Sequence, residues 1–84
     1  HFDENSKNVL NDIYSRFSLS EAITSVSLFI SKYEEINEGL WNLYREDKVT
    51  KEELRWRRFG ATLNHFNIQD EFMANEMADY YVYH

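Results

Sequence analysis

The sequence first suggests chemistry in a row of polar and aromatic side chains, Asn37, Trp41 and Tyr44. They lie at i, i+4 and i+7, so a helix over this stretch would project all three from one side. Arg58, across the turn that follows, would supply a positive charge. Such a patch is able to face a ligand. Aromatic stripes at this spacing also form helical cores, so the alternative interpretation buries Trp41 and uses Asn37 to cap a neighbouring element.

The segment YREDKVTKEEL, residues 44–54, ends like the exit of a calcium-binding EF-hand loop. With Glu53 as the twelfth position of that loop, Tyr44 falls where an oxygen ligand is required and Asp47 falls where a glycine is required. Thr50 and Glu53 fit a capping box better, in which each side chain accepts a hydrogen bond from the backbone N–H of the other residue. The segment is therefore predicted to end one helix, turn over residues 46–49 and start the next helix.

No catalytic or metal-binding signature is present elsewhere in the sequence. The histidines His1, His65 and His84 have no partner at the i, i+4 spacing of a zinc-binding helix, and there is no cysteine. Nucleophile motifs and phosphate-binding glycine loops are also absent. We interpret the many carboxylates as a solvated acidic face, because nothing in their pattern demands a buried acid/base pair.

Length, composition and charge limit the class of protein. The 84 residues make a single domain, residues 1–84, and 43% hydrophobic with 17% aromatic side chains predict a packed core. The net charge of −6 disfavours a nucleic-acid partner, which needs clustered Lys and Arg. No apolar run approaches the roughly 20 residues that span a bilayer, and no signal-peptide pattern is present, so no membrane partner is expected.

Four amphipathic helices are predicted to position these side chains, because the sequence lacks proline and its two glycines fall inside periodic segments. The expected helices cover residues 4–17, 25–46, 51–66 and 70–84. Asp3 or Asn5 is the expected cap of the first helix, Ser25 caps the second, and Ser18 with Glu21 opens a short turn between them. Gly39, inside the second helix, costs about 1 kcal/mol relative to Ala and is a candidate for close packing or ligand approach.

The predicted fold is all-α, an up-and-down four-helix bundle whose two ends lie together. Each helix carries one apolar face, a pattern typical of helices packed around a common core. The apolar faces are predicted to comprise Val9, Leu10, Ile13, Tyr14 and Phe17; Leu28, Phe29, Ile36, Leu40, Trp41 and Tyr44; Trp56, Phe59, Gly60, Leu63 and Phe66; and Phe72, Met73, Met77, Tyr80 and Tyr81.

Four runs of this sequence, INEGLW at 36–41, YR at 44–45, KVTKEEL at 48–54 and RF at 58–59, carry a resemblance to a known family. They resemble the helical cap of haloacid dehalogenase (HAD) superfamily phosphatases, and most closely the nucleotidase-like branch that dephosphorylates pyrimidine nucleoside monophosphates. The similarity is clearest from residue 25 to residue 81 and weakest over residues 18–24. Residues 1–5 look like the segment that follows the first core strand, and residues 80–84 look like the return to the core. Together with the absence of an initial Met, this resemblance leads us to expect an excised cap domain.

The resemblance implies a division of labour between this chain and a Rossmann-like core outside it. The core would hold the catalytic aspartates, the phosphate-binding residues and the Mg²⁺ ligands, and an aspartate would attack the phosphate. The cap would close over the site and contact a small-molecule phosphate ester through Asn37, Trp41 and Arg58, while having no catalytic residue or metal of its own. The family is mostly cytoplasmic, so the resemblance implies that compartment.

Two further expectations concern partners. An isolated cap could self-associate through the surface that normally meets its core. The alternative function is a stand-alone acidic helical interaction module that binds a partner helix in an aromatic-lined groove.

Overall fold

The computed structural model describes residues 4–84, and over that range the chain is helical with no strand. The helices are α1 (Glu4–Arg16), the short 3₁₀ helix η1 (Leu19–Glu21), α2 (Val26–Arg45), α3 (Lys51–His65) and α4 (Glu71–Tyr83). The predicted all-α four-helix fold is therefore confirmed. Asp3, one of the two expected caps of α1, and the start of the chain lie outside the described residues.

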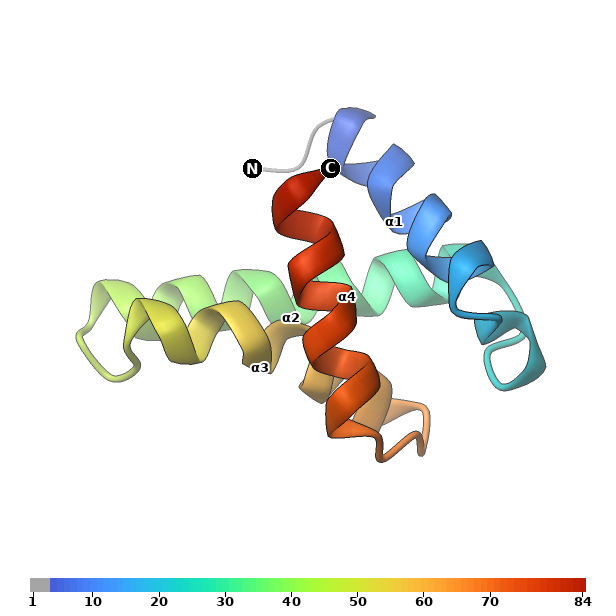
Figure 1. The fold of residues 1–84 in the computed structure, drawn as a ribbon. Coiled ribbons are helices and arrows are strands. Elements are labelled where there is room, and N and C mark those ends of the chain that lie inside the picture. The colour runs from blue at the N-terminus through green and yellow to red at the C-terminus, as the bar shows by residue number, and fades with distance from the viewer. Residues whose placement is uncertain (1–3) are drawn as a thin grey trace.

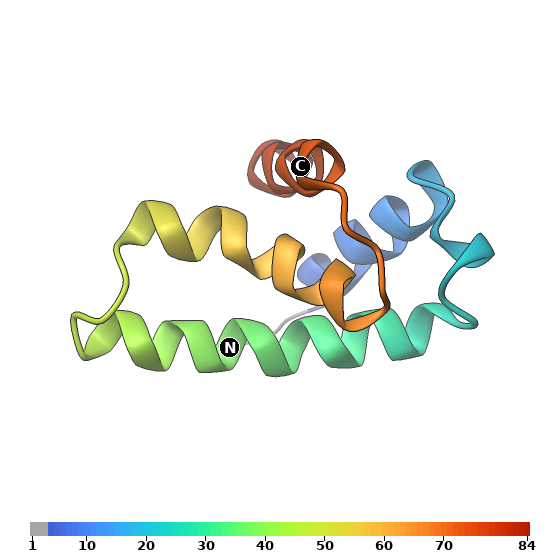
Figure 2. The same cartoon turned by 90° about the horizontal axis from the view of Figure 1, so that it is seen from below.

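The longest helix, α2, forms an antiparallel hairpin with α3 (Figure 1). Helix α4 lies across α3 on the side away from α2, so that Figure 2 shows α4 almost end-on above the hairpin. Helix α1 contacts both α2 and α4 and closes the remaining side. Because α4 crosses the hairpin, it covers only part of α3.

Side-chain caps fix where three of the helices begin. The Ser25 hydroxyl accepts a hydrogen bond from the Leu28 N–H at 3.2 Å, and the Asp70 carboxylate accepts one from the Met73 N–H at 3.0 Å. At α3 both bonds of the predicted capping box are present: the Thr50 hydroxyl accepts from the Glu53 N–H at 3.0 Å, and the Glu53 carboxylate accepts from the Thr50 N–H at 2.8 Å. These caps satisfy backbone donors that a helix leaves without intrahelical partners.

Two of the side chains predicted as caps, Asn5 and Ser18, do not cap a helix in the structure. Asn5 lies within α1 and does not cap it. Ser18 precedes the predicted short turn, η1, but its side chain makes no capping bond. Its backbone is left-handed, with φ at 55°, and its N–H donates to the Ser15 carbonyl at 3.2 Å. Ser18 therefore follows α1 in the position where left-handed residues commonly terminate helices, and it also precedes η1, where its carbonyl accepts from the Glu21 N–H at 3.4 Å.

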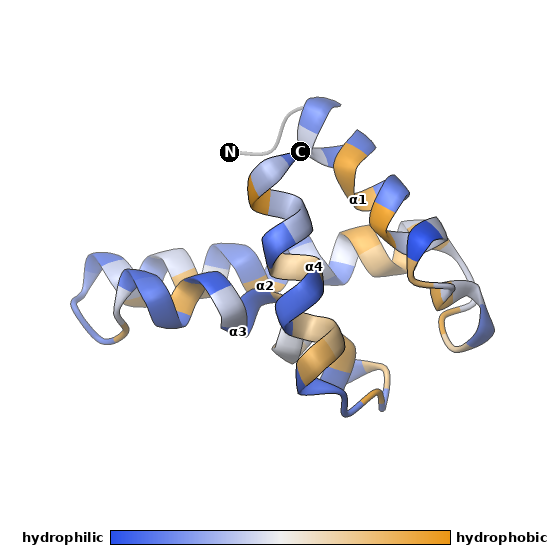
Figure 3. Ribbon diagram, viewed as in Figure 1, coloured by the Kyte–Doolittle hydropathy of each residue, from blue (hydrophilic) through white to orange (hydrophobic). Residues whose placement is uncertain are grey.

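The core forms where the four helices converge, and Figure 3 shows the outer half of the α2–α3 hairpin to be mostly hydrophilic. The buried residues of the core are Val9, Leu10, Ile13, Leu19, Ile23, Phe29, Tyr33, Phe59, Leu63, Ala74, Met77 and Ala78. Most of these positions follow the predicted apolar faces. Tyr33, the largest fully buried side chain, was not among the residues predicted for the core.

Three residues predicted for apolar faces are exposed. Leu28 is 52% exposed and Phe72 is 73% exposed. Each adjoins a more buried apolar residue, Phe29 or Met73, and neighbouring residues of a helix point about 100° apart, so only one of each pair faces the core. Trp56 is 46% exposed.

Candidate functional site

The structure brings Asn37 and Arg58 into contact across the α2–α3 hairpin. Arg58 donates from Nη1 to Asn37 Oδ1 at 3.4 Å, a long hydrogen bond between residues 21 positions apart. The antiparallel hairpin returns the chain along α2 after the turn that the Thr50 cap ends, and so makes this contact possible. Asn37 is thus a partner of Arg58.

Arg58 is buried to an extent that is rare for arginine, with 9% of its surface exposed. Its guanidinium carbon lies 5.2 Å from the centre of the Tyr81 ring, within cation–π range. Within residues 4–84, the buried Nε has no hydrogen-bond acceptor. A buried guanidinium with one long hydrogen bond retains donor capacity that an anion would satisfy.

A pocket of about 420 Å³ lies between the C-terminal part of α2, the N-terminal part of α3 and the end of α4. We call it the Trp41–Arg58 pocket, and it is lined by Trp41, Lys51, Glu52, Leu54, Arg55, Arg58 and Val82. Two of the three predicted substrate-facing residues are thus found in one cavity. Asn37 is not part of the lining, because it lies on the α2 side of Arg58.

The charge of the Trp41–Arg58 pocket is opposite to that of the whole chain. Three cations and one carboxylate line it, whereas the net charge of the chain is −6. The Trp41 indole supplies an aromatic wall and packs edge-to-face on Tyr44, with ring centres 5.5 Å apart. The arrangement can bind an anion that also carries a flat apolar group.

Lys51 and Arg55 were missed as site residues by the sequence analysis. Together with Arg58 they lie at i, i+4 and i+7, the same spacing that singled out the row on α2. That spacing was therefore an available signal for a basic face on α3. Val82 reaches the pocket only because α4 crosses the hairpin, and no pattern in the sequence indicates that crossing.

An aromatic cluster supports the buried side of Arg58. The rings of Tyr33 and Phe59 lie 4.8 Å apart, and the Tyr81 ring lies 5.7 Å from each of them. Burial raises the pKa of the Tyr33 phenol far above its ordinary value; the positive charge of Arg58 opposes that rise and Tyr81 adds to it. The cluster therefore keeps Tyr33 neutral and fixes the ring over which Arg58 lies.

Other candidate residues stand apart from the pocket. His65 is exposed on α3 and packs edge-to-face on Phe66. In the described part of the chain, no group of three or more His, Asp or Glu side chains could hold a metal ion. Over residues 4–84, no helix is both long enough and apolar enough to cross a membrane.

Comparison with known proteins assigns no family or function to the chain. No protein-family model and no curated protein sequence matches the chain.

Proposed function

We propose that this chain is the helical cap of a HAD-family phosphatase, closing over an active site carried elsewhere in the protein and helping to select a phosphorylated small molecule. The proposed substrate is a nucleoside monophosphate. The observation that supports this proposal is the Trp41–Arg58 pocket, in which three cations and an indole face one cavity.

The chemistry of the pocket suits the two ends of a nucleotide. Arginine guanidinium groups pair with phosphate oxygens through charge-assisted hydrogen bonds from donors in a fixed geometry. Arg55 and Arg58 provide two guanidinium groups in the pocket. The Trp41 indole offers a flat face for a base. The pocket volume of about 420 Å³ lies at the small end of the range for ligand sites, which run from about 300 to 1,000 Å³.

Asn37 takes a positioning role in this proposal. Its amide oxygen accepts a hydrogen bond from the Arg58 guanidinium, and the guanidinium carbon lies 5.2 Å from the centre of the Tyr81 ring. Holding the group between two partners lowers the entropy that Arg58 would lose on binding an anion.

The Mg²⁺ ion of the proposed enzyme would be held outside this chain. The described residues contain no cluster of acidic and histidine side chains that fits a Mg²⁺ site, so we assign no metal ligand and no catalytic step to them. The proposed contribution of this chain is substrate contact and exclusion of water on closure.

A second candidate function, a stand-alone acidic module for protein interaction, is favoured by a different observation. Trp56, Phe72 and Tyr83 expose 46%, 73% and 76% of their surface. Exposed aromatic residues are common anchors in protein interfaces. This alternative requires a partner helix to cover them, whereas the cap proposal requires core-domain sequence on both sides of the chain.

Phosphate release separates the two functions. The 84-residue chain and a polypeptide extended in both directions along its gene are assayed with Mg²⁺ and a panel of nucleoside monophosphates. The cap proposal expects activity only in the extended protein, and it expects Arg55→Ala to lower kcat/KM by about tenfold, the value of one lost charge-assisted contact. Arg57→Ala, which removes a neighbouring arginine that does not line the pocket, is the matched control. An inert extended protein, or equal effects of the two variants, would refute the proposal.

A further inference from the structure

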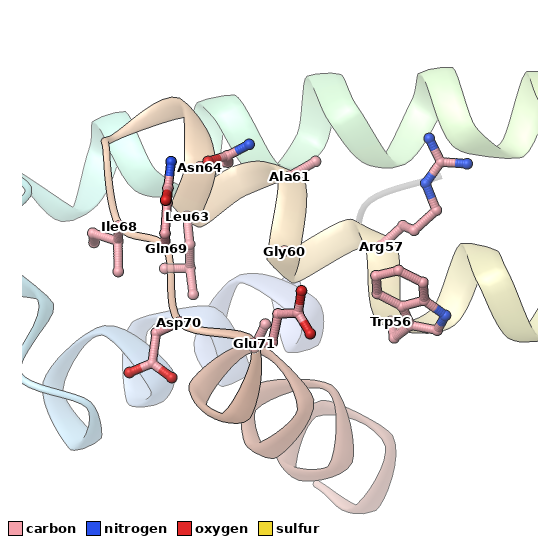
Figure 4. A pocket seen from close by; sticks show the side chains of 11 residues that line it. Trp56, Arg57, Gly60, Ala61, Leu63, Asn64, Ile68, Gln69, Asp70 and Glu71 are labelled. Atoms are coloured by element: carbon pink, nitrogen blue, oxygen red, sulfur yellow. The ribbon is translucent and has the colours of Figure 1, made fainter.

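A second and larger cavity lies on the opposite side of α3 from the hairpin partner, where α4 begins. We call this cavity of about 710 Å³ the α3–α4 groove. Trp56, Gly60 and Asn64 of α3 line it together with Asp70 and Glu71 at the start of α4 (Figure 4). It shares no lining residue with the Trp41–Arg58 pocket.

Gly60 leaves the middle of the groove open. A methyl group placed at Gly60 would meet no atom within 4 Å, so close helix packing does not account for a glycine at this position. Glycine inside a helix costs about 1 kcal/mol relative to alanine. The missing side chain gives a ligand access to the backbone of α3 beside the Trp56 indole, which is 46% exposed.

The charged residues that line the groove are two carboxylates, Glu71 and Asp70, and one cation, Arg57. Figure 4 shows the Glu71 side chain extending from the first turn of α4 toward Gly60, on the side of the groove where Trp56 lies. No Lys, Arg or His of residues 4–84 forms a salt bridge with Glu71. Arg57 also lines the groove, but its guanidinium points away from Glu71. Asp70, which caps α4 by accepting from the Met73 N–H, adds a second negative charge.

We propose that the α3–α4 groove binds an organic cation, with an ammonium group seated between the indole of Trp56 and the carboxylate of Glu71. An aromatic face attracts a cation through its quadrupole, and a carboxylate beside it pairs with the charge. The net charge of −6 favours the approach of cations over anions. The ligand class is an alkylammonium or methylated ammonium compound, and the site is independent of the phosphate-ester function proposed above.

The test uses Trp56 as the reporter of binding. Trp41→Phe leaves Trp56 as the single tryptophan of the chain, since the sequence has two. Tetramethylammonium chloride is titrated while emission is recorded, and sodium chloride at equal ionic strength serves as the salt control. The expected result is a saturable change with tetramethylammonium and none with sodium.

Variants of the groove decide the outcome. Glu71→Gln should weaken tetramethylammonium binding about fivefold. Glu76→Gln, an exposed carboxylate on the same helix that does not line the groove, should leave it unchanged. Gly60→Leu fills the groove with a better helix former and should abolish binding while the chain stays folded. An equal response to sodium, or equal affinities of the Glu71→Gln and Glu76→Gln variants, would overturn the proposal.

A second arm identifies the source of the ammonium group. A blocked lysine, N-acetyl-lysine methylamide, is compared with its trimethylated form and with free alkylamines. Tighter binding of either blocked lysine supports recognition of a peptide side chain, and tighter binding of a free amine supports a small-molecule ligand. Failure of all three to compete with tetramethylammonium would contradict the proposed site.

Discussion

Arg58 Nη1 lies 3.4 Å from Asn37 Oδ1, so a nearly buried arginine on α3 has a single long hydrogen bond to α2. The sequence left two interpretations open for these residues, packing within the fold and contact with a ligand. Arg58 packs against Asn37 and also lines the Trp41–Arg58 pocket, so the two interpretations are compatible. Packing and ligand contact are therefore two roles of one side chain, and they can be separated by substitution.

Arg58→Met and Arg58→Ala should differ in stability and agree in function. Methionine keeps most of the buried volume, so its free energy of unfolding should stay within about 1 kcal/mol of the parent value. Alanine leaves a cavity beside Tyr81 and should lower the free energy of unfolding by about 2 kcal/mol. Both variants should lose nucleotide binding. Urea denaturation measures the stabilities, and a methionine variant as unstable as the alanine variant would show that the charge itself is needed for folding.

Tyr33 should make the protein sensitive to alkaline pH. Burial raises the pKa of its phenol above the ordinary value of 10.0 in the folded chain. Above about pH 10 the unfolded chain ionises this tyrosine while the folded chain keeps it protonated, so the free energy of unfolding falls by up to about 1.4 kcal/mol per pH unit. Below about pH 10 both the folded and the unfolded chain keep the Tyr33 proton, so none of this free energy of unfolding is lost.

Tyr33→Phe removes this group and is the direct check. Urea denaturation of parent and variant is compared between about pH 8 and pH 11, so that contributions common to both proteins cancel in the difference. The parent should lose stability more steeply than the variant above about pH 10. Parallel curves would mean that Tyr33 does not retain its proton in the folded state.

The sequence was sufficient to predict the four helices and the caps of α2 and α3, because periodicity and capping depend on residues close together in the chain. It was not sufficient to predict every residue of the buried faces. Leu28 and Phe72 adjoin residues that are more buried, and the choice between such neighbours depends on how each helix packs against the others.

The same limit applies to the candidate site. The Asn37–Arg58 contact could be anticipated from the sequence, since the two residues lie on helices joined by one predicted turn. Val82 in the pocket was not, because it depends on a crossing between helices distant in sequence. The bond from the Tyr80 hydroxyl to Asp12 Oδ2, at 3.3 Å, joins residues 68 positions apart and is equally invisible to local patterns.

Alanine at either glycine should stabilise the chain. Gly39 and Gly60 lie inside α2 and α3 with ordinary helical backbone, and a methyl group at either position meets nothing within 4 Å. Each substitution should raise the free energy of unfolding by about 0.5 to 1 kcal/mol, because alanine loses less conformational entropy in a helix. Thermal denaturation checks this, and a lower melting temperature at Gly39 would restore the expectation of close packing there.

Thr50→Ala should destabilise the start of α3. The threonine hydroxyl accepts from the Glu53 N–H, and loss of such a cap costs about 1 kcal/mol. Ser18→Ala is the matched control, since the Ser18 side chain makes no capping bond. Urea denaturation should show a loss for Thr50→Ala and almost none for Ser18→Ala. Equal losses would mean that the capping box contributes nothing specific.

Binding of a nucleoside monophosphate to the 84-residue chain tests the Trp41–Arg58 pocket most directly. Trp56→Phe leaves Trp41 as the reporter, and uridine monophosphate is titrated at low salt with uridine and inorganic phosphate as controls. We predict saturable quenching of Trp41 by the nucleotide, weaker quenching by either control, an affinity about tenfold lower in Arg55→Ala, and no change in Arg57→Ala. The absence of saturable quenching, or an equal loss in the two arginine variants, would contradict the assignment of this pocket to a phosphorylated ligand.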